Sequence, residues 1–287
     1  MKLNAIYVQD CIAFMEGLEA DGEKPFDVIV TSPPYNLNKP YSRYKDDKKR
    51  DTFKADMAQL AEVSKSVLKD NGSFFLNFGG KPTDPWMAWE VAEEFKRQYE
   101  LQNVFHWIKA ISIPEDMQVK RSNDMNHDVS FGHFKPINSP FYLNQCQEYI
   151  FHFTKNGDVP LDKLAIGVPY QDKSNVKRWK REGEGGKQRD KRDRGNVWFI
   201  RYPTKVGSAR KILHPAEFPP KLPYLCIKLH GIKKDMVVYD PYMGIGNTAL
   251  ACKTLGVAYV GTDIDPQYVE VAERSLSQLE LAPRPNP

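Results

Sequence analysis

The chain has 287 residues, of which 41% are hydrophobic and 27% charged, so it can build a sizeable core and is unlike a disordered protein. Its net charge of +4 is a mild excess that permits an anionic partner without requiring one. The four cysteines lack CxxC spacing, and no signal peptide or apolar run of about 18 residues occurs, so we expect reduced thiols, no membrane attachment and a cytoplasmic location.

Strands and helices alternate along the first part of the chain. Apolar runs predict strands at 5–8, 26–30, 73–78 and 104–108. Helical spacing of apolar residues predicts helices at 11–18 and 53–68, and a third that opens at Asp84-Pro85 and runs toward Tyr99. Asp70-Asn71-Gly72 predicts a turn. The run FDVIV at 26–30 is continuously apolar, which is typical of a strand buried on both faces.

The second part of the chain resumes this alternation after an irregular stretch. A strand is expected near 148–153, and periodicity is then lost from 155 to 215. Beyond that stretch we expect helices at 218–230, 248–255 and 266–279, with strands at 236–239 and 258–260. Alternating strands and helices predict an α/β fold with a doubly wound, mainly parallel sheet.

A glycine-containing turn, DPYMGIGNTALAC, occupies residues 240–252, between a predicted strand and a predicted helix. Its glycines allow a tight turn, and a helix N-terminus presents N–H groups that suit a carboxylate or phosphate. Asp263 follows the next strand about twenty residues later, where a carboxylate can accept hydrogen bonds from both hydroxyls of a ribose. The glycine-containing turn and Asp263 together indicate a nucleoside-containing cofactor, which could be NAD, FAD or S-adenosylmethionine. Ala249 stands where the dinucleotide fingerprint usually has glycine, a modest argument against NAD.

The motif TSPPYN, residues 31–36, follows the buried strand FDVIV. Its prolines lack N–H groups and fix the backbone, so the segment presents carbonyl acceptors in a stiff, extended form. It lies beyond the carboxyl end of a strand, where open α/β sheets bind ligands. The Ser32 hydroxyl, the carbonyls and the Tyr35 ring suit an aromatic base with an exocyclic amine, and stacking on such a ring contributes about 1–3 kcal/mol per base. An ordinary turn is the other interpretation.

TSPPYN resembles the catalytic motif of the DNA amino-methyltransferases, (Ser/Asn/Asp)-Pro-Pro-(Tyr/Phe), and DPYMGIGNT resembles their S-adenosylmethionine motif. The catalytic motif comes first, which is the order of the β class. VQDCI, HPAEFPPKLPYLCI and NVWFIRYP, at 8–12, 214–227 and 196–203, resemble three further segments of the family. The resemblance covers both ends of the chain and leaves roughly 110–195 unmatched, apart from the strand near 148–153. The departures are small: Tyr242, Ile245 and Asn247 replace the usual phenylalanine, serine and threonine.

The resemblance implies a Rossmann-like class I S-adenosylmethionine-dependent methyltransferase fold with circularly permuted motif order and an inserted target-recognition region. It divides the chain into a catalytic half at 1–110, a recognition region at 111–195 that includes a core strand near 148–153, and a cofactor-binding half at 196–282. Residues 283–287 are expected to form a flexible tail.

The resemblance also implies which residues form the site. The catalytic residues would be Ser32, Pro33, Pro34 and Tyr35. Among the cofactor residues, Asp10 would contact the adenine amine, Asp263 the ribose, and Thr31 with Asp240 would align the methyl-bearing sulfur. The full set of cofactor residues is Asp10, Cys11, Thr31, His214, Phe218, Lys221, Asp240, Pro241, Tyr242, Gly244, Gly246, Asn247, Thr248, Asp263 and Ile264.

A basic, glycine-containing stretch lies between the two motifs. Such charge runs are usually solvated loops. Here its cations could neutralise DNA phosphates, namely Lys177, Arg178, Lys180, Arg181, Lys187, Arg189, Lys191, Arg192 and Arg194. Residues 112–147 are rich in side chains that can read base edges. His127 and His133 lack a third ligand at suitable spacing, so no metal is expected.

The preferred function is a sequence-specific DNA methyltransferase that modifies the N4 amine of a flipped-out cytosine in a restriction-modification context. Adenine-N6 methylation is the alternative. It is less favoured, because serine at the position of Ser32 is commonest in the cytosine-N4 enzymes, whereas adenine-N6 enzymes of this class usually carry aspartate. Cytosine-C5 methylation is disfavoured, since no cysteine follows a proline. A nucleotide-dependent oxidoreductase and a non-catalytic DNA-binding module are more distant alternatives. Expected partners are double-stranded DNA and a separately encoded restriction endonuclease, with the enzyme a monomer or homodimer.

Overall fold

The computed structural model describes residues 1–110, 139–170, 191–201 and 216–281, and its centre is an eight-stranded sheet of order β1-β10-β9-β2-β3-β5-β4-β8. The strands are β1 (Ala5–Val8), β2 (Phe26–Thr31), β3 (Leu68–Phe78), β4 (Glu100–Ala110), β5 (Gln147–Thr154), β8 (Val197–Arg201), β9 (Val237–Asp240) and β10 (Ala258–Asp263). In this sheet only the pairings of β5, with β3 and with β4, are antiparallel. The expected α/β fold with a mainly parallel sheet is confirmed.

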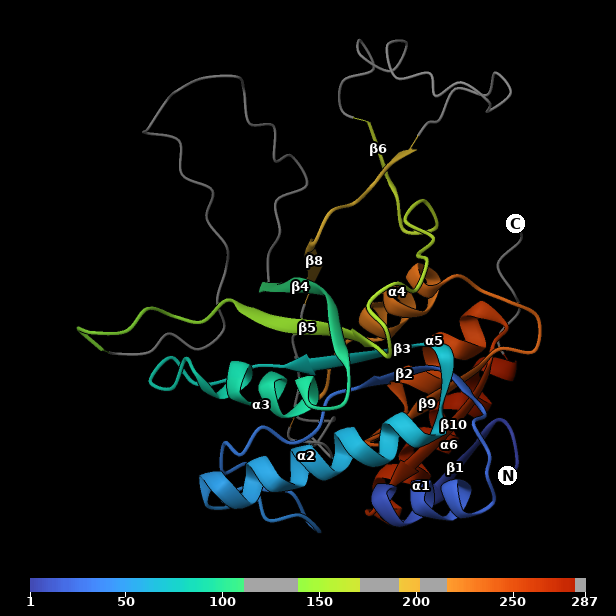
Figure 1. Cartoon of the computed structure of the whole chain (residues 1–287), viewed down its shortest axis with the longest axis horizontal. Helices are drawn as coiled ribbons and strands as arrows, with labels where there is room; N and C mark the ends of the chain where they lie inside the picture. Colours follow the sequence, from blue (N-terminus) through green and yellow to red (C-terminus); the bar gives the residue numbers. More distant parts are fainter. Residues whose placement is uncertain (111–138, 171–190, 202–215, 282–287) are drawn as a thin grey trace.

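Helices cover both faces of the sheet, as expected for a doubly wound fold (Figure 1). One face packs against α1 (Cys11–Ala20), α2 (Arg50–Val67) and α3 (Met87–Lys96), and the other against α4 (Lys221–His230), α5 (Asn247–Leu255) and α6 (Pro266–Leu281). Successive residues of a strand point to opposite faces, so Val28 and Val30 join one core cluster while Ile29 joins the other. All six side chains of β2 are buried, which explains its continuous apolar sequence.

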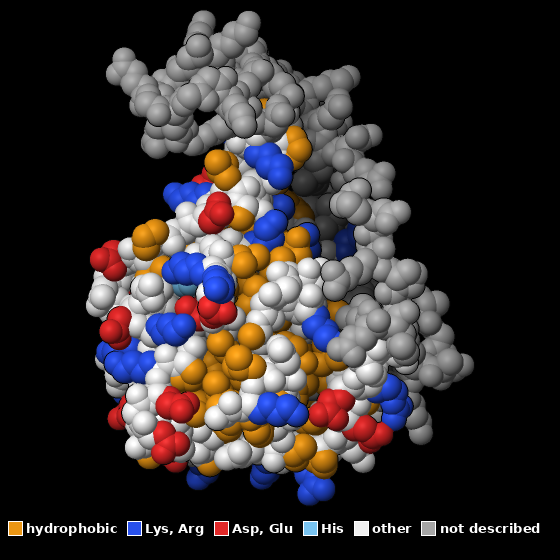
Figure 2. All heavy atoms as spheres, turned by 90° about the vertical axis from the view of Figure 1, so that its right-hand side faces the viewer, with side chains coloured by type: hydrophobic (Ala, Val, Ile, Leu, Met, Phe, Trp, Pro, Cys, Tyr) orange, Lys and Arg blue, Asp and Glu red, His pale blue; other side chains and the backbone are white. Residues whose placement is uncertain are grey.

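A small two-stranded unit, β6 (Val168–Pro169) with β7 (Lys191–Arg192), stands away from the central sheet in Figure 1. Figure 2 shows one face of the molecule, on which basic and acidic side chains are interspersed around a central apolar area. Among the helices of the described ranges, none is long and apolar enough to cross a membrane.

Three local expectations are wrong. Asp70-Asn71-Gly72 lies inside β3 rather than in a turn, because the pairing of β2 with β3 shifts between Phe26↔Leu68 and Val28↔Ser73 and absorbs the extra residues as an irregularity. The helix expected from Asp84 begins at Met87, since Asp84 forms an isolated bridge with Lys81. The helix expected from 218 begins at Lys221, after two prolines.

The irregular stretch expected from 155 to 215 contains a strand of the main sheet. β8 pairs in parallel with β4 from His106↔Val197 to Ala110↔Arg201. Its side chains alternate between exposed and buried, but exposed Val197 and Phe199 are as apolar as buried Trp198 and Ile200. The alternation is therefore not visible in the sequence.

The parallel strands β1, β10, β9 and β2 all end at the same edge of the sheet. Residues that follow these strands therefore lie close together although they are far apart in sequence. The TSPPYN motif follows β2, the glycine turn follows β9, and Asp263 ends β10. The candidate site is expected at this edge.

Candidate active site

A cavity of about 360 Å³ lies at this edge, between the ends of β1, β2, β9 and β10. Its wall includes Ser32 and Pro34 from the TSPPYN motif. It also includes most of the predicted cofactor residues, namely Asp10, Cys11, Phe218, Pro241, Tyr242, Gly244, Asn247, Asp263 and Ile264. The structure thus brings together residues from both ends of the chain.

The glycine turn is fastened to the neighbouring strand by Asp263. One carboxylate oxygen of Asp263 accepts from the N–H of Gly244 (2.8 Å), and the other accepts from the N–H of Asp265 (2.9 Å). Burial raises the pKa of Asp263, and these backbone N–H groups partly offset the rise. Gly246 adopts a left-handed conformation (φ 89°) at the start of α5. The turn is therefore held in one shape at the cavity wall.

Asp240 organises the layer behind this wall. Its carboxylate accepts from the hydroxyls of Thr31 (2.8 Å) and Thr248 (2.5 Å) and from the backbone N–H of Tyr242 (3.0 Å). Burial raises its pKa to about 6, against the lowering effect of these donors. These bonds join β2, β9 and α5 directly behind the cavity.

Several predicted cofactor residues do not line the cavity. These are Thr31, Lys221, Asp240, Gly246 and Thr248, all within the described ranges. The ammonium of Lys221 lies 4.6 Å from the ring centre of Tyr224. His214 lies outside the described residues. A direct cofactor contact of these residues stays a prediction.

Asp10 and Cys11 form the end of the cavity near β1. Asp10 caps α1: its backbone is extended, and its side-chain Oδ1 accepts from the N–H of Ala13 at 3.0 Å. The Asp10 side chain is nevertheless exposed and lines the cavity. Burial raises the pKa of the Cys11 thiol to about 12, so this thiol stays protonated and is not a nucleophile.

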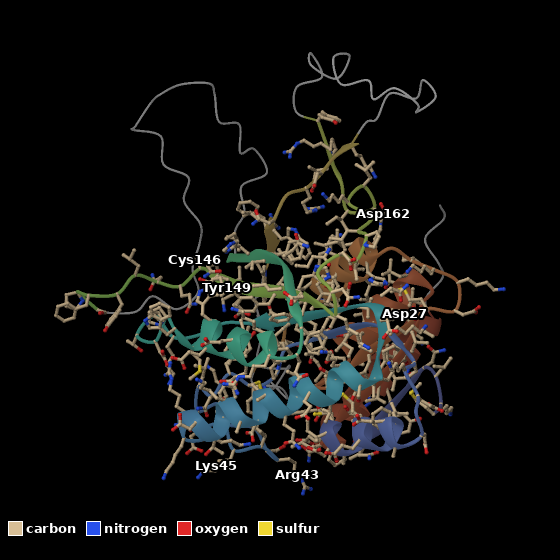
Figure 3. All side chains as sticks on the ribbon, viewed as in Figure 1. Asp27, Arg43, Lys45, Cys146, Tyr149 and Asp162 are labelled. Atoms are coloured by element: carbon tan, nitrogen blue, oxygen red, sulfur yellow. The ribbon has the colours of Figure 1, made fainter. Side chains whose placement is uncertain are left out.

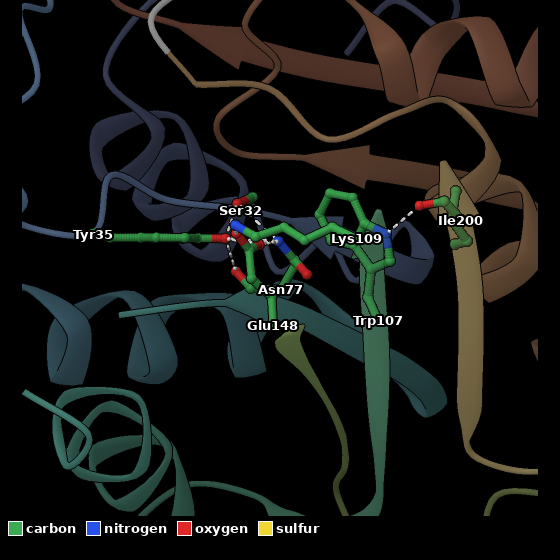
Figure 4. Close-up of polar contacts among 7 residues, drawn as sticks. All are labelled: Ser32, Tyr35, Asn77, Trp107, Lys109, Glu148 and Ile200. Carbon is green, nitrogen blue, oxygen red and sulfur yellow. Dashed lines mark hydrogen bonds and ion pairs between the residues drawn. The ribbon is translucent and has the colours of Figure 1, made fainter. Parts of the chain in front are cut away.

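Hydrogen bonds fix the tyrosine of the TSPPYN motif (Figure 4). The Tyr35 hydroxyl lies 2.8 Å from Ser32 Oγ and 2.6 Å from Asn77 Nδ2, and it donates to Glu148 Oε2 at 2.9 Å. Burial and the Glu148 carboxylate raise the pKa of this hydroxyl, which therefore remains protonated. The ring packs on Phe78 with 4.5 Å between ring centres. Its contact with a target base stays a prediction.

A second cavity of about 280 Å³ meets the motif from the other side. Ser32, Pro33 and Tyr35 line it, together with residues from β3, β4 and β5. Ser32 is on the wall of both cavities, so one hydroxyl stands where the two spaces adjoin.

Sequence reasoning missed three polar residues of this second cavity, Asn77, Lys109 and Glu148. Lys109 forms an ion pair with Glu148, in which the Lys109 ammonium contacts Oε1. Burial acts to raise the pKa of Glu148, but Lys109, Asn77 and Tyr35 together lower it below its ordinary value, so the group is a carboxylate. Asn77 could have been noticed in the sequence, because it is a polar residue within the largely apolar strand predicted at 73–78. Lys109 and Glu148 lie at the ends of predicted strands and gave no such signal.

The loop that follows the motif folds over the first cavity. The Asp46 carboxylate accepts from the backbone N–H groups of Asn36 (2.8 Å), Leu37 (3.0 Å) and Lys39 (3.0 Å). The Ser42 hydroxyl donates to Asp265, beyond β10. The loop is thus tied to both ends of the site.

Aromatic and basic side chains of this loop take part in the cavity. Tyr41, Arg43 and Tyr44 line it. Figure 3 shows Arg43 and Lys45 at the lower edge of the molecule, and Cys146 and Tyr149 around the start of β5. Arg43 is exposed, so it stands between the cavity and solvent.

A short segment, residues 216–218, lines both cavities from the other half of the chain. Asn247 holds it, because its side-chain amide donates to the carbonyl of Phe218 at 2.8 Å. This bond links the first turn of α5 to the segment across the site.

Three of the predicted DNA-binding residues lie in the described ranges. Lys191 and Arg192 are exposed on β7. Arg194 is half-buried, and its Nε donates to the carbonyl of Ile166 at 2.9 Å, while burial lowers the pKa of its guanidinium. The others, Lys177, Arg178, Lys180, Arg181, Lys187 and Arg189, lie outside the described residues, as do His127 and His133. DNA contact of all nine cations stays a prediction.

The first cavity fits S-adenosylmethionine by its chemistry. Carboxylates at Asp10 and Asp263 supply acceptors for an adenine amine and ribose hydroxyls, and Tyr242 supplies an aromatic surface. A volume of about 360 Å³ is in the range of small-molecule sites. This sheet, with its cavity at the carboxyl ends of the parallel strands, defines a class I S-adenosylmethionine-dependent methyltransferase fold.

The family follows from sequence comparison. The model of the DNA methylase family, which covers N6 and N4 methyltransferases, matches residues 26–274, and the chain belongs to this family. The family depends on S-adenosylmethionine, so the chain is an S-adenosylmethionine-dependent DNA methyltransferase.

Individual relatives are distant but cover most of the chain. Type II methyltransferase M.BglII of Bacillus subtilis is 25% identical over 277 residues, 96% of this chain and 69% of that protein. Type II methyltransferase M.SmaI of Serratia marcescens is 26% identical over 288 residues, 94% of this chain and 90% of that protein.

Solved structures share the fold. PvuII DNA methyltransferase (cytosine-N4-specific) has a TM-score of 0.64 at 17% identity, over 94% of this chain and 84% of that chain. A DNA modification methylase of Thermus thermophilus, complexed with S-adenosyl-L-methionine, has a TM-score of 0.54 at 16% identity, over 95% and 93% of the two chains.

Proposed function

We propose that this enzyme transfers a methyl group from S-adenosylmethionine to the exocyclic N4 amine of a cytosine in double-stranded DNA. The observation that carries the proposal is the position of Ser32 on the wall of both cavities. A cofactor in the first cavity and a base in the second would meet at this hydroxyl. A base stacked in a duplex cannot enter such a cavity, so the cytosine must be flipped out.

The residues of the first cavity would hold the cofactor. Asp263 would accept from the ribose hydroxyls and Asp10 from the adenine amine, as carboxylates are suited to do. S-adenosylmethionine would supply a methyl group activated by the positively charged sulfur. The amine lone pair would attack the methyl carbon, and the carbon–sulfur bond would break to release S-adenosylhomocysteine. The layer formed by Thr31, Asp240 and Thr248 keeps the surrounding strand ends in place.

The residues of the TSPPYN motif would prepare the amine. Ser32 Oγ and the Pro33 carbonyl accept its hydrogens, which favours a pyramidal nitrogen whose lone pair is free to react. The rate gain comes from alignment and from oxygens fixed where positive charge develops on nitrogen. After transfer the methylated nitrogen would lose one proton to water, and no covalent bond to the enzyme would form. Pro34 stiffens the segment and the Tyr35 ring contacts the base.

Cytosine is favoured over adenine by the hydroxyl of Ser32. A hydroxyl can accept from N4–H or donate to N3, whereas an ionised aspartate can only accept. Aspartate is usual in adenine-N6 enzymes of this class, and the similar PvuII enzyme is described as cytosine-N4-specific. Adenine-N6 methylation is the second candidate.

The relatives also suggest a setting. Several are named Type II methyltransferases, so we place this enzyme in a restriction-modification system with a separately encoded endonuclease, acting on DNA in the cytoplasm. Residues 111–195 would form the target-recognition region, and the basic residues between 177 and 194 would contact phosphates. The enzyme would act as a monomer or homodimer.

Nucleoside analysis tests the base assignment. Unmethylated genomic DNA is incubated with the enzyme and methyl-labelled S-adenosylmethionine, digested, and measured for N4-methylcytosine and N6-methyladenine by mass spectrometry. We expect the label in N4-methylcytosine. Ser32→Ala should lower the single-turnover rate while calorimetry shows cofactor affinity largely unchanged. Label in N6-methyladenine would refute the cytosine assignment and leave the methyltransferase assignment intact.

A further inference from the structure

The ion pair between Lys109 and Glu148 lies in the wall of the second cavity, and the function proposed above does not use it. The Glu148 side chain is 10% exposed and that of Lys109 28%. An ion pair removed from water gains little net stability, because desolvation offsets the attraction. Its place in a cavity wall beside Ser32 therefore points to a role toward a ligand.

Glu148 is fully engaged in holding its neighbours. One oxygen contacts the Lys109 ammonium, and the other accepts from the Tyr35 hydroxyl (2.9 Å) and from Asn77 Nδ2 (2.8 Å). The Tyr35 hydroxyl in turn lies 2.8 Å from Ser32 Oγ. Figure 4 shows the Lys109 side chain extending along this network toward Ser32. The carboxylate thus fixes a cation at a set position relative to the catalytic hydroxyl.

Asn77 adds a second, independent observation. Its amide orientation is fixed, because an amide oxygen in the place of Nδ2 would repel the Glu148 carboxylate. Its Oδ1 is buried and has no hydrogen-bond partner among the described residues, although the residue lines the cavity. A buried acceptor without a partner is unfavourable, because it has lost its hydrogen bonds to water. A cavity wall with a fixed cation and an unsatisfied acceptor suits a polar, planar ligand.

The edge of the target base complements this wall. In cytosine the reactive amine is a donor and the neighbouring ring nitrogen N3 is an acceptor, and in adenine N1 takes the same place. We propose that Lys109 donates a hydrogen bond to the ring nitrogen beside the reactive amine, with Glu148 as the positioning residue that holds the ammonium and Asn77 as the residue that holds Glu148. This inference rests on the proposed function, in which the second cavity receives the base.

The bond would serve both orientation and selectivity. A donor at the ring nitrogen and acceptors at the amine define the rotation of the base in its plane, which alignment-dependent catalysis requires. The ring nitrogen is also more nucleophilic than the exocyclic amine nitrogen, because the amine lone pair is delocalised into the ring. A hydrogen bond from Lys109 occupies the competing lone pair.

The contact between Lys109 and the ring nitrogen is tested by a double-substitution cycle, in which each of the two partners is removed alone and then both together. Lys109→Met keeps an unbranched side chain, one atom shorter than lysine, and removes its charge. Single-turnover rates at saturating S-adenosylmethionine are measured on a duplex that carries the methylated site, and on the same duplex with the target N3 replaced by C–H. The site is located beforehand by sequencing DNA that the enzyme has methylated.

We expect the variant to be about 10- to 100-fold slower than the wild type on the native duplex, as loss of a charged donor produces. On the analogue the two enzymes should differ by less than about 3-fold, because the acceptor is already missing. The matched control is Lys24→Met, which removes an exposed lysine paired with Asp70 (3.6 Å) just before β2, at the other end of that strand from Ser32. It should behave as the wild type on both duplexes.

If Lys109→Met lowers the single-turnover rate equally on both duplexes, the proposed contact is refuted, since Lys109 would then act without the ring nitrogen. Because Lys109→Met leaves Glu148 unpaired, thermal melting and cofactor titration are run in parallel. If that variant does not fold, Lys109→Met combined with Glu148→Gln removes both charges, and the same cycle decides. If the labelled base is adenine, the cytosine assignment fails, and the cycle is run with an adenine whose N1 is replaced by C–H.

Discussion

Gly246 provides a direct test of how the glycine turn is built. Its backbone is left-handed (φ 89°), and a Cβ added there would lie 2.8 Å from Cβ of Ala272 on α6. The left-handed conformation costs a non-glycine residue about 1–2 kcal/mol. Forcing an extra methyl group into a packed interior adds about 1–3 kcal/mol. Gly246→Ala should therefore lower the free energy of unfolding by about 2–5 kcal/mol.

Gly256 is the matched control. It is also left-handed (φ 67°) but has nothing within 4 Å of the added Cβ, so Gly256→Ala should cost only the conformational part, about 1–2 kcal/mol. Denaturant unfolding of both variants gives the difference. Since Gly246 lies between Ile245 and Asn247, which both line the cavity, its variant should also bind S-adenosylmethionine more weakly in calorimetry, whereas the Gly256 variant should not.

A second variant tests the packing part alone. Ala272→Gly removes the atom that the new Cβ would meet, at its own cost of about 0.5–1 kcal/mol for glycine inside a helix. Added to Gly246→Ala, it should restore part of the lost stability and cofactor binding. Equal losses at Gly246 and Gly256, or no rescue by Ala272→Gly, would refute the reasoning from close packing.

Two other regions give further predictions. Asp46→Ala removes the acceptor for the N–H groups of Asn36, Leu37 and Lys39 and should loosen the loop over the first cavity. Release of S-adenosylmethionine, measured by stopped-flow, should therefore be faster than in the wild type. An unchanged release rate would contradict a role of the loop in retaining the cofactor. His152 and His230 both contact Ser73, and burial lowers their pKa values to about 3 and about 4, below the ordinary 6.5, so they are neutral in the folded state. Above pH 6.5 both histidines are neutral in the folded and in the unfolded state. Below pH 6.5 the unfolded chain binds protons while the folded state does not. The free energy of unfolding should therefore fall by up to about 1.4 kcal/mol per pH unit for each histidine, until the pH reaches the folded-state pKa. Denaturant unfolding from pH 7.5 to 5 measures this, and the slope of the His230→Asn variant should be smaller; an identical slope would contradict the assignment.

The sequence was most informative where chemistry follows a strand end. FDVIV, MVVY and the run ending at Asp263 are recognisable strands, so the residues after them could be placed at one edge of a parallel sheet from the sequence alone. The prediction could not separate the cavity wall from the layer behind it. Thr31 adjoins Ser32 in sequence, yet Thr31 is buried against Asp240 while Ser32 lines the cavities. Neighbours in a strand face opposite sides, and the sequence does not say which side the ligand takes.

The residues of the second cavity could not be placed for a topological reason. Chain order suggests that β3, β4 and β5 follow one another, but β5 lies between β3 and β4 and runs antiparallel to both. An antiparallel strand brings its amino end to the edge where its parallel neighbours have their carboxyl ends. Glu148, near the start of β5, therefore meets Asn77 near the end of β3 and Lys109 near the end of β4.

The direction of β5 also places the proposed recognition region. The chain leaves the sheet after β4 at Ala110 and returns at Gln147, so the connection both starts and ends at the edge that carries Ser32. Had β5 run parallel to its neighbours, Glu148 would stand at the opposite edge and the Lys109 ammonium would lack its carboxylate. A single strand reversal thus completes the second cavity and sets the insertion point of residues 111–146 beside it.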